Sequence, residues 1–342
     1  MRGEFVFIYV LRRIAFLVLV LFIVTAITFS LAYLVPGDPA RLVAGDKASQ
    51  EQVARVRLEL GLDRPVPVQY YLYLGRLLRG DLGRSLHSNR PVLEDVRDFF
   101  SATFELTTLA MLLALAIGVP LGVISAVRRG SAVDHASRLF SLSGVSIPVF
   151  WLGLLLQLAF GMTLGLPIGG RVGSRVLMDA PLITRTGLYL VDSLLSGNWP
   201  VLASACQHIL LPAVTLALPT LVLVTRMARS SLLEVLVQDY VRTHRACGLP
   251  ERVVVYKYAL KNAMLATLTI VGLGYGYMLG GSFLVETVFA WPGLGRYAVS
   301  SIINSDYPAI MGVTLLITVV YGLVNLAVDL SYAWIDPRVK LR

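Results

Sequence analysis

Hydrophobic residues occur along this chain in long, nearly uncharged runs, and polar residues gather in the segments between the runs. A run of about 20 apolar residues is long enough to cross the roughly 30 Å hydrocarbon core of a bilayer as a helix. We therefore predict an all-α membrane protein with six transmembrane helices. Their expected positions are residues 14–35, 104–127, 139–164, 207–227, 264–288 and 309–334.

The segment after the first predicted span is polar and is expected to hold only short helices. Ser49 and Gln52 have the spacing of a capping box. Residues 68–78 form an amphipathic stretch with three tyrosines, which are favoured at membrane interfaces. We expect both stretches to lie on the outer face. A cleaved signal peptide is the alternative interpretation of the first apolar run, but the run is too long and no small-residue cleavage site follows it.

These boundaries divide the chain into four parts. Residues 1–35 hold the N-terminus and the first span, and residues 36–103 form an extracytoplasmic helical insertion. Residues 104–334 form a five-helix core, and residues 335–342 form a cytoplasmic tail.

Composition and charge agree with a membrane protein. Of the 342 residues, 56% are hydrophobic and 15% are charged, which is too apolar for one soluble core. The net charge of +9 could suggest nucleic-acid binding, but no nucleic-acid motif accompanies it. The short loops are rich in Arg and Lys, which places them in the cytoplasm. Six spans then put both termini in the cytoplasm.

The longest basic, polar interruption in the second half of the chain is residues 230–262, here called the elbow. Two short helical patterns meet in it. Gly248 can adopt the left-handed conformation that ends a helix, and Pro250 suits the start of the next, which we expect from Glu251 to about Lys261. Ala246 and Gly248 are small enough for a partner to approach the backbone. An ordinary positively charged cytoplasmic loop is the alternative.

The elbow resembles a known motif. It reads Asp239-Tyr240-Val241-Arg242-Thr243, then Arg245-Ala246 and Gly248-Leu249, and later Ala259-Leu260-Lys261-Asn262-Ala263. This is similar to the coupling motif of ABC importer permeases of the dipeptide, oligopeptide and nickel group, D-Y-[IV]-R-T-A-R-A-K-G-L. The chain departs from it at His244, where the group has Ala, and at Cys247, where it has Lys. The resemblance implies coupling to an ATPase through Asp239, Tyr240, Arg242, Thr243, Arg245, Ala246, Gly248 and Leu249.

Other stretches resemble the same group, namely residues 34–39, 61–63, 80–83, 147–151 and 280–295. Pro148 frees a carbonyl inside a predicted span, and Glu286 places a carboxylate near membrane depth. Both features indicate a water-filled path or a polar partner. We predict a translocation pathway or outer gate that involves Pro148, Phe150, Trp151, Ser282 and Glu286. A packing kink at Pro148 and an interfacial side chain at Glu286 remain open as alternatives.

Several motifs are missing from the sequence. There is no G-x-x-x-x-G-K-[ST] phosphate-binding loop, no H-E-x-x-H zinc motif and no nucleophile elbow. Cys206 and Cys247 have no metal-binding or disulfide framework around them. No span carries the paired acids of a proton- or sodium-driven carrier. We therefore predict no catalytic residue, cofactor or metal in this chain, and an external energy source for any transport.

The resemblance implies a type I ABC importer permease fold in a prokaryotic inner membrane. It also implies a second, similar permease, two cytoplasmic ATP-binding subunits that use ATP and magnesium, and an extracytoplasmic substrate-binding protein. The expected substrate is a short peptide, with nickel chelates or glutathione as alternatives. An ion-coupled secondary transporter and a membrane enzyme are the other classes considered.

Overall fold

The computed structural model describes residues 2–34, 40–41, 48–59, 61 and 63–335. Within these residues every named element is a helix, and the only β pairing is one isolated bridge between Arg84 and Pro91. The chain divides into two compact units. Unit 1 contains Met1–Tyr9, Ser101–Arg296 and Tyr321–Arg342, and unit 2 contains Val10–Phe100 and Tyr297–Val320.

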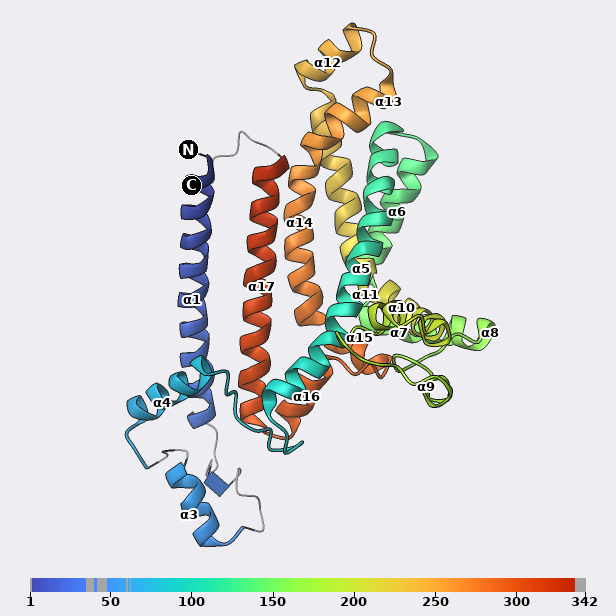
Figure 1. Cartoon of the computed structure of the whole chain (residues 1–342). Coiled ribbons are helices and arrows are strands. Elements are labelled where there is room, and N and C mark those ends of the chain that lie inside the picture. Colours follow the sequence, from blue (N-terminus) through green and yellow to red (C-terminus); the bar gives the residue numbers. More distant parts are fainter. Residues whose placement is uncertain (1, 35–39, 42–47, 60, 62, 336–342) are drawn as a thin grey trace. The chain divides into compact units, whose positions relative to one another are not determined.

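The described residues hold five helices long and apolar enough to cross a membrane, which confirms the all-α membrane class (Figure 1). They are α1 (Arg2–Leu34), α5 (Val92–Val127), α11 (Trp199–Leu236), the continuous helix of α13, η2 and α14 (Glu251–Gly281), and α17 (Tyr307–Ile335). The sixth apolar segment that the sequence predicts is present, but it is not a single helix.

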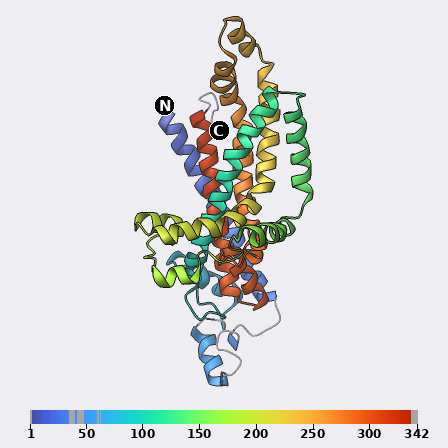
Figure 2. The ribbon, with the colours of Figure 1, turned by 90° about the vertical axis from the view of Figure 1, so that its right-hand side faces the viewer.

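The expected continuous span over residues 139–164 is divided at a proline. α6 (Ala132–Ser146) begins at the N-cap Ser131, whose side chain accepts a hydrogen bond from the Asp134 N–H, and it stops at Ile147. The residue before a proline is driven to extended backbone, and Ile147 has φ −90° and ψ 123°. The chain continues as α7 (Val149–Leu156), the π-helix η1 (Gln157–Gly161) and α8 (Met162–Leu164). Figure 2 shows α6 alongside α11, and α7 turned across it.

A stripe of mostly small residues runs along α5 (Val92–Val127) where it meets α11. Ala102, Ala110, Ala114, Gly118, Gly122 and Ala126 lie on this stripe at intervals of four or eight residues, with the larger Leu106 between the first two. Such a stripe lets two membrane helices approach closely. At Gly122 an added Cβ would lie only 2.7 Å from the Thr225 carbonyl oxygen of α11, and at Gly118 it would lie 3.0 Å from that of Leu221. Larger residues at these two positions would push α5 and α11 apart.

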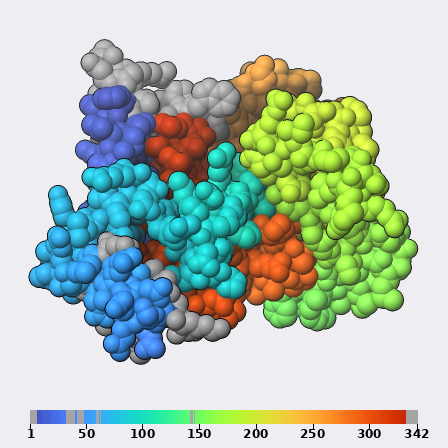
Figure 3. All heavy atoms as spheres, turned by 60° about the horizontal axis from the view of Figure 1, so that its bottom comes forward, coloured from blue at the N-terminus to red at the C-terminus, as the bar shows by residue number. Residues whose placement is uncertain are grey.

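The long loop between α8 and α11 carries two short helices, α9 (Ser174–Asp179) and α10 (Tyr189–Leu195). A buried ion pair fixes it to α5, because Arg171 donates to Glu105 at 2.5 Å and its guanidinium lies 3.8 Å from the centre of the Tyr189 ring. Glu105 also accepts from the Leu190 N–H at 2.7 Å. Figure 3 shows α8 to α10, coloured green to yellow-green, as one continuous part of the surface.

Unit 2 contains the two short helices of the insertion. α3 (Gln50–Glu59) begins with the predicted capping box, in which the Ser49 N–H donates to Gln52 Oε1 at 2.9 Å. α4 (Val66–Leu78) packs on α1 through aromatic side chains. Tyr70 and Thr25 share a hydrogen bond of 2.8 Å, and the Tyr73 ring stacks on Phe29.

Another polar contact in unit 2 joins the 80–91 loop to the start of α17. Ser85 donates to the fully buried Asp306 at 2.5 Å, and the His87 N–H donates to the same carboxylate oxygen at 3.2 Å. Predicted features at residues 35–39, 62 and 336–342 lie outside the described residues.

Candidate functional site

The elbow includes the last turns of α11, which ends at Leu236, and it turns sharply at Gly248. α12 (Asp239–Ala246) is closed by a Schellman motif, in which the Leu249 N–H donates to His244 and the Gly248 N–H donates to Arg245. Gly248 has φ +75°, in the left-handed region that the sequence predicted for it. Among the residues that the structure describes, no atom lies within 4 Å of a Cβ placed at Gly248, so the backbone there is open to an approaching partner.

One apolar side chain of α12 anchors the elbow to the rest of unit 1. Val241 is fully buried and packs in a cluster with Val123 and Ala126 of α5, Leu232 of α11, and Val254. The burial of one aliphatic side chain contributes about 1.5–3 kcal/mol. The remaining residues of α12 are therefore held in place without being buried themselves.

The opposite face of α12 is exposed and polar. Asp239, Arg242, Thr243 and Ala246 are exposed and follow the spacing i, i+3, i+4, i+7, which places them on one side of a helix. The side chain of Asp239 is 98% exposed and that of Arg242 is 69% exposed. They approach each other at 3.6 Å, a surface pair that contributes little. Four of the eight predicted coupling residues thus share one outward face.

The other predicted coupling residues mainly hold the elbow together. Arg245 donates to both Glu251 oxygens, at 3.1 and 2.7 Å, and so bridges the Gly248 turn. Tyr240 accepts from Asn262 at 2.7 Å. Leu249 is half-buried and packs against the cluster around Val241.

His244, one of the residues that depart from the family pattern, has a specific contact. The His244 ring stacks on Tyr258, with ring centres 4.1 Å apart and an interplanar angle of 29°. An alanine at this position would leave the Tyr258 ring uncovered on that side. The substitution in this chain therefore adds a contact between α12 and the helix that follows the turn.

The second half of the elbow differs from the sequence prediction. α13 (Glu251–Val253), the π-helix η2 (Val254–Ala259) and α14 (Leu260–Gly281) run on without a break. The prediction of a separate helix that ends near Lys261 was therefore wrong. The π-turn inserts extra backbone into the helix while keeping it continuous.

Sequence reasoning missed three structural residues of the elbow, namely Val241, Glu251 as the partner of Arg245, and Tyr258 as the partner of His244. Val241 stood inside the quoted motif, where one apolar residue among polar ones is the usual sign of a buried anchor. The two partner residues lie across the turn, and no local spacing identifies them.

A second polar cluster, here called the Glu286 clamp, lies in the core of unit 1. It consists of Thr103, Ser282, Glu286, Leu294 and Arg296. Glu286 lies on α15 (Phe283–Val288) and is fully buried. Thr103 donates to its Oε1 at 2.6 Å, Ser282 donates to the same oxygen at 2.9 Å, and the Arg296 N–H donates to Oε2 at 2.8 Å.

The turn after α15 is shaped around the carboxylate of Glu286. An added Cβ at Gly293 would clash with that carboxylate, which explains why glycine stands there. The Leu294 N–H donates to Thr103 at 2.7 Å, and Trp291 Nε1 donates to the Ala102 carbonyl at 3.0 Å. The turn and the start of α16 (Leu294–Ile303) are thus tied to α5. Ser282 and Glu286 are predicted gate residues, and the structure places both inside the protein.

The remaining predicted pathway residues stand apart from the Glu286 clamp. Pro148 precedes α7 and is exposed, and Phe150 and Trp151 are 42% and 47% exposed on α7. They form part of an apolar surface of that helix. In the described part of the chain, no group of three or more His, Cys, Asp or Glu residues is arranged to hold a metal ion.

Similar proteins place this architecture in a family. The family described as "Binding-protein-dependent transport system inner membrane component" matches residues 118–341, and its N-terminal component matches residues 6–107. The probable D,D-dipeptide transport system permease protein DdpB of Escherichia coli is 51% identical over 94% of each chain. The dipeptide transport system permease protein DppB of Alkalihalophilus pseudofirmus is 44% identical over 97% of this chain and 99% of its own.

A solved structure shares the fold. A chain of the MetNI methionine ABC transporter in an inward-facing conformation superposes with a TM-score of 0.50 and 18% identity. It covers 69% of this chain and 93% of its own length. The match supports the type I ABC importer permease fold that the motifs indicated, and the chain is a multi-pass inner-membrane protein. From its sequence and its fold, it belongs to the family of binding-protein-dependent transport system inner membrane components, as an ABC importer permease of the dipeptide, oligopeptide and nickel group.

Proposed function

We propose that this chain forms half of the translocation pathway of an ATP-driven importer of short peptides. Relatives named for dipeptide transport, at 51% and 44% identity over nearly the whole chain, support a peptide substrate. A relative named for glutathione transport, the permease GsiC of Salmonella choleraesuis, is 39% identical over 98% of this chain, so glutathione is the second candidate.

The observation that carries the proposal is the exposed face of α12. Asp239, Arg242, Thr243 and Ala246 present a polar surface beside the open backbone at Gly248, while Val241 anchors the helix from below. A cytoplasmic ATP-binding subunit would dock on this face. Its movement on ATP binding would pass into α11 and into the continuous helix of α13, η2 and α14, both of which reach the elbow.

The assembly that this function needs contains four further subunits. They are a second permease, two ATP-binding subunits that use ATP and magnesium, and an extracytoplasmic substrate-binding protein. We assign no catalytic activity to this chain, because a permease supplies the path and the ATP-binding subunits supply the hydrolysis.

We also propose an orientation and a path. The elbow and both termini face the cytoplasm, and the 36–103 insertion faces outward, near the binding protein. Pro148, Phe150 and Trp151 would line the pathway or its interface with the second permease. Ser282 and Glu286 would act on the outer gate indirectly, by fixing the turn after α15. A membrane-impermeant maleimide should label the exposed Cys247 only in permeabilised cells, and labelling in intact cells would reverse this orientation.

Uptake of a labelled dipeptide into proteoliposomes tests the function. The full complex with its binding protein should accumulate dipeptide only with ATP, and excess glutathione or a nickel chelate should compete weakly. Uptake by this chain alone, driven by a proton gradient without ATP, would contradict the proposal and indicate a secondary transporter. Stronger competition by glutathione would move the substrate assignment to that peptide.

A further inference from the structure

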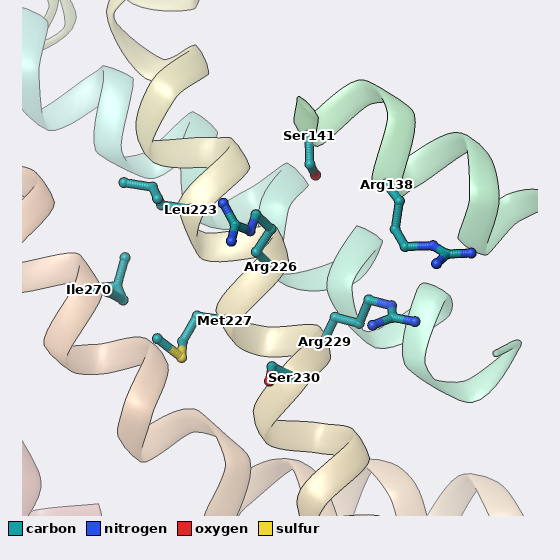
Figure 4. A pocket seen from close by; sticks show the side chains of 8 residues that line it. All are labelled: Arg138, Ser141, Leu223, Arg226, Met227, Arg229, Ser230 and Ile270. Atoms are coloured by element: carbon teal, nitrogen blue, oxygen red, sulfur yellow. The ribbon is translucent and has the colours of Figure 1, made fainter. Parts of the chain in front are cut away.

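A cavity of about 550 Å³ lies in unit 1 between α6, α11 and α14, on the half of α11 that leads to the elbow. Its two sides differ in chemistry. Figure 4 shows Leu223, Met227 and Ile270 on one side, and Ser141, Arg138 and Arg229 on the other. The cavity therefore offers an apolar wall next to a basic one.

The basic side has more positive charge than its acidic partner can neutralise. Asp134 is the carboxylate that meets the lining arginines, and Arg229 holds it at 2.7 and 3.0 Å. Hydrogen bonding from Arg229, helped by the Gly130 N–H and the Ser125 hydroxyl, holds the pKa of Asp134 well below its usual range, so its charge is constant. Arg138 lies 3.9 Å from the same carboxylate and donates to His135 at 2.7 Å.

Arg226 is the third arginine of the lining, and it does not pair with Asp134. It lines the cavity with an exposed side chain, and the described residues give it no hydrogen-bond or ion-pair partner. Three arginines line the cavity, and Asp134 pairs with two of them, Arg138 and Arg229, so these four groups together carry a net charge of three minus one, or +2. The lining contains no Asp or Glu. This composition selects an anion.

Arg226 also stands at the inner end of the apolar run, residues 207–227, that the sequence predicts to cross the membrane. It precedes the end of α11 at Leu236 by ten residues, about 15 Å along the helix axis, and it follows a long apolar run. A guanidinium group near the hydrocarbon boundary is costly unless it meets a partner, and basic pockets between membrane helices are suited to anionic head groups.

We propose that this cavity binds the phosphate head group of an anionic phospholipid, with Arg226 as its main contact. Arg138 and Arg229 would complete the positive field, and the hydroxyls of Ser141 and Ser230 could donate to phosphate oxygens. The acyl chains would run along the apolar wall. A peptide fits less well, because its ammonium group would find no carboxylate in the lining to receive it.

The inference does not depend on the transported substrate or on the role of the elbow. Lipid binding can be measured in a complex that is inactive in transport. Failure of peptide uptake would leave this proposal standing, and failure of lipid binding would leave the proposed function standing.

The experiment uses the full complex reconstituted into bilayers of phosphatidylcholine with phosphatidylglycerol, followed by native mass spectrometry to count the phosphatidylglycerol that remains bound. Arg226→Gln should retain about fivefold less, the effect of one arginine near an anionic head group. Arg226→Lys keeps the charge and should retain most of the lipid. Arg129→Gln removes an exposed arginine outside this cavity and should match the unmodified protein.

Two results would overturn the proposal. One is equal phosphatidylglycerol retention by Arg226→Gln, Arg129→Gln and the unmodified complex, with all three assembled in equal amounts. The other is displacement of the lipid by a dipeptide with a free carboxylate, but not by its amidated form, which would assign the cavity to the cargo.

Discussion

At the elbow the polar residues Asp239, Arg242 and Thr243 point outward, whereas at the Glu286 clamp the polar groups point inward and satisfy one another. Asp239 and Arg242 are exposed and weakly paired. Glu286 is fully buried and accepts hydrogen bonds from two hydroxyls and from the backbone. Both regions turn at a glycine, but Gly248 faces open space and Gly293 faces a carboxylate.

This difference shows two physical reasons why a polar residue stands in a sequence motif. A buried polar group must be satisfied internally, so each member of the Glu286 clamp is fixed by its neighbours. The outward residues Asp239, Arg242 and Thr243 of α12 are not buried, and in the proposed function their pattern serves a docking subunit. Changes at the clamp should therefore lower the amount of folded protein, and changes at the elbow should leave it folded but uncoupled.

The largest effect is expected for Glu286→Ala. It removes the acceptor of the Thr103 and Ser282 hydroxyls and of the Arg296 N–H, and it leaves a cavity. A loss of about 3–5 kcal/mol of stability is expected from these combined terms. Quantitative immunoblotting of membranes should show a several-fold drop in abundance.

The matched control is Glu234→Ala, at an exposed glutamate of α11, which should stay within about 0.5 kcal/mol of the unmodified protein. Normal abundance of Glu286→Ala with loss of uptake would instead assign Glu286 a direct part in gating, and the contrast between clamp and elbow would fail.

The next effect is expected for Gly248→Val. A branched residue at φ +75° is strained, and its side chain would occupy the space that a docking subunit needs. Because no atom of the described residues lies within 4 Å of an added Cβ there, the protein should reach normal abundance. ATP hydrolysis stimulated by the loaded binding protein should fall at least about tenfold, the effect of about 1.4 kcal/mol in coupling.

Gly130→Val separates strain from docking. Gly130 has φ +79° and, like Gly248, has no atom of the described chain within 4 Å of an added Cβ. Both variants carry the same backbone strain, but only Gly248 lies on the proposed docking surface. Equal loss of stimulated hydrolysis in the two variants would remove the evidence for a docking surface at the elbow.

The smallest effect is expected within the elbow, between Arg242→Ala and Arg245→Ala. Arg242 is on the outward face, and its loss should weaken association with the ATP-binding subunit by about two- to fivefold, as for one rim charge. Arg245→Ala breaks the pair with Glu251, which is half-exposed and contributes about 1 kcal/mol or less. Pull-down of the ATP-binding subunit at increasing salt should distinguish the two variants, because only Arg242 would interact electrostatically across the interface with that subunit. The reverse order would place Arg245 at the interface.

The sequence was sufficient to predict the structural features that depend on local residue patterns. Apolar length located the membrane helices, the Ser49 and Gln52 spacing located a capping box that is present, and Gly248 was expected to be left-handed and is. Each of these depends on residues close together in the chain. Local physical chemistry therefore determined them before any tertiary contact was known.

Features set by tertiary contacts were not predictable. Pro148 divides an apolar segment, whereas Pro212 and Pro219 lie inside the continuous α11. The effect of a membrane proline depends on whether neighbouring helices satisfy the freed carbonyl. α5 also begins at Val92 rather than near Phe104, because an apolar run marks only the part of a helix that meets lipid. The burial of Glu286 required Thr103, about 180 residues away in the chain.

The unbroken passage from Glu251 to Gly281 has a mechanical consequence. A helix of these 31 residues is about 46 Å long. If it tilts as a rigid rod by about 5° at its elbow end, its far end is displaced by about 4 Å, which exceeds the diameter of a water molecule. The π-turn at Val254–Ala259 lies next to the elbow end of this helix. A small change in backbone winding there would displace the far end of the helix more than the same change nearer that end.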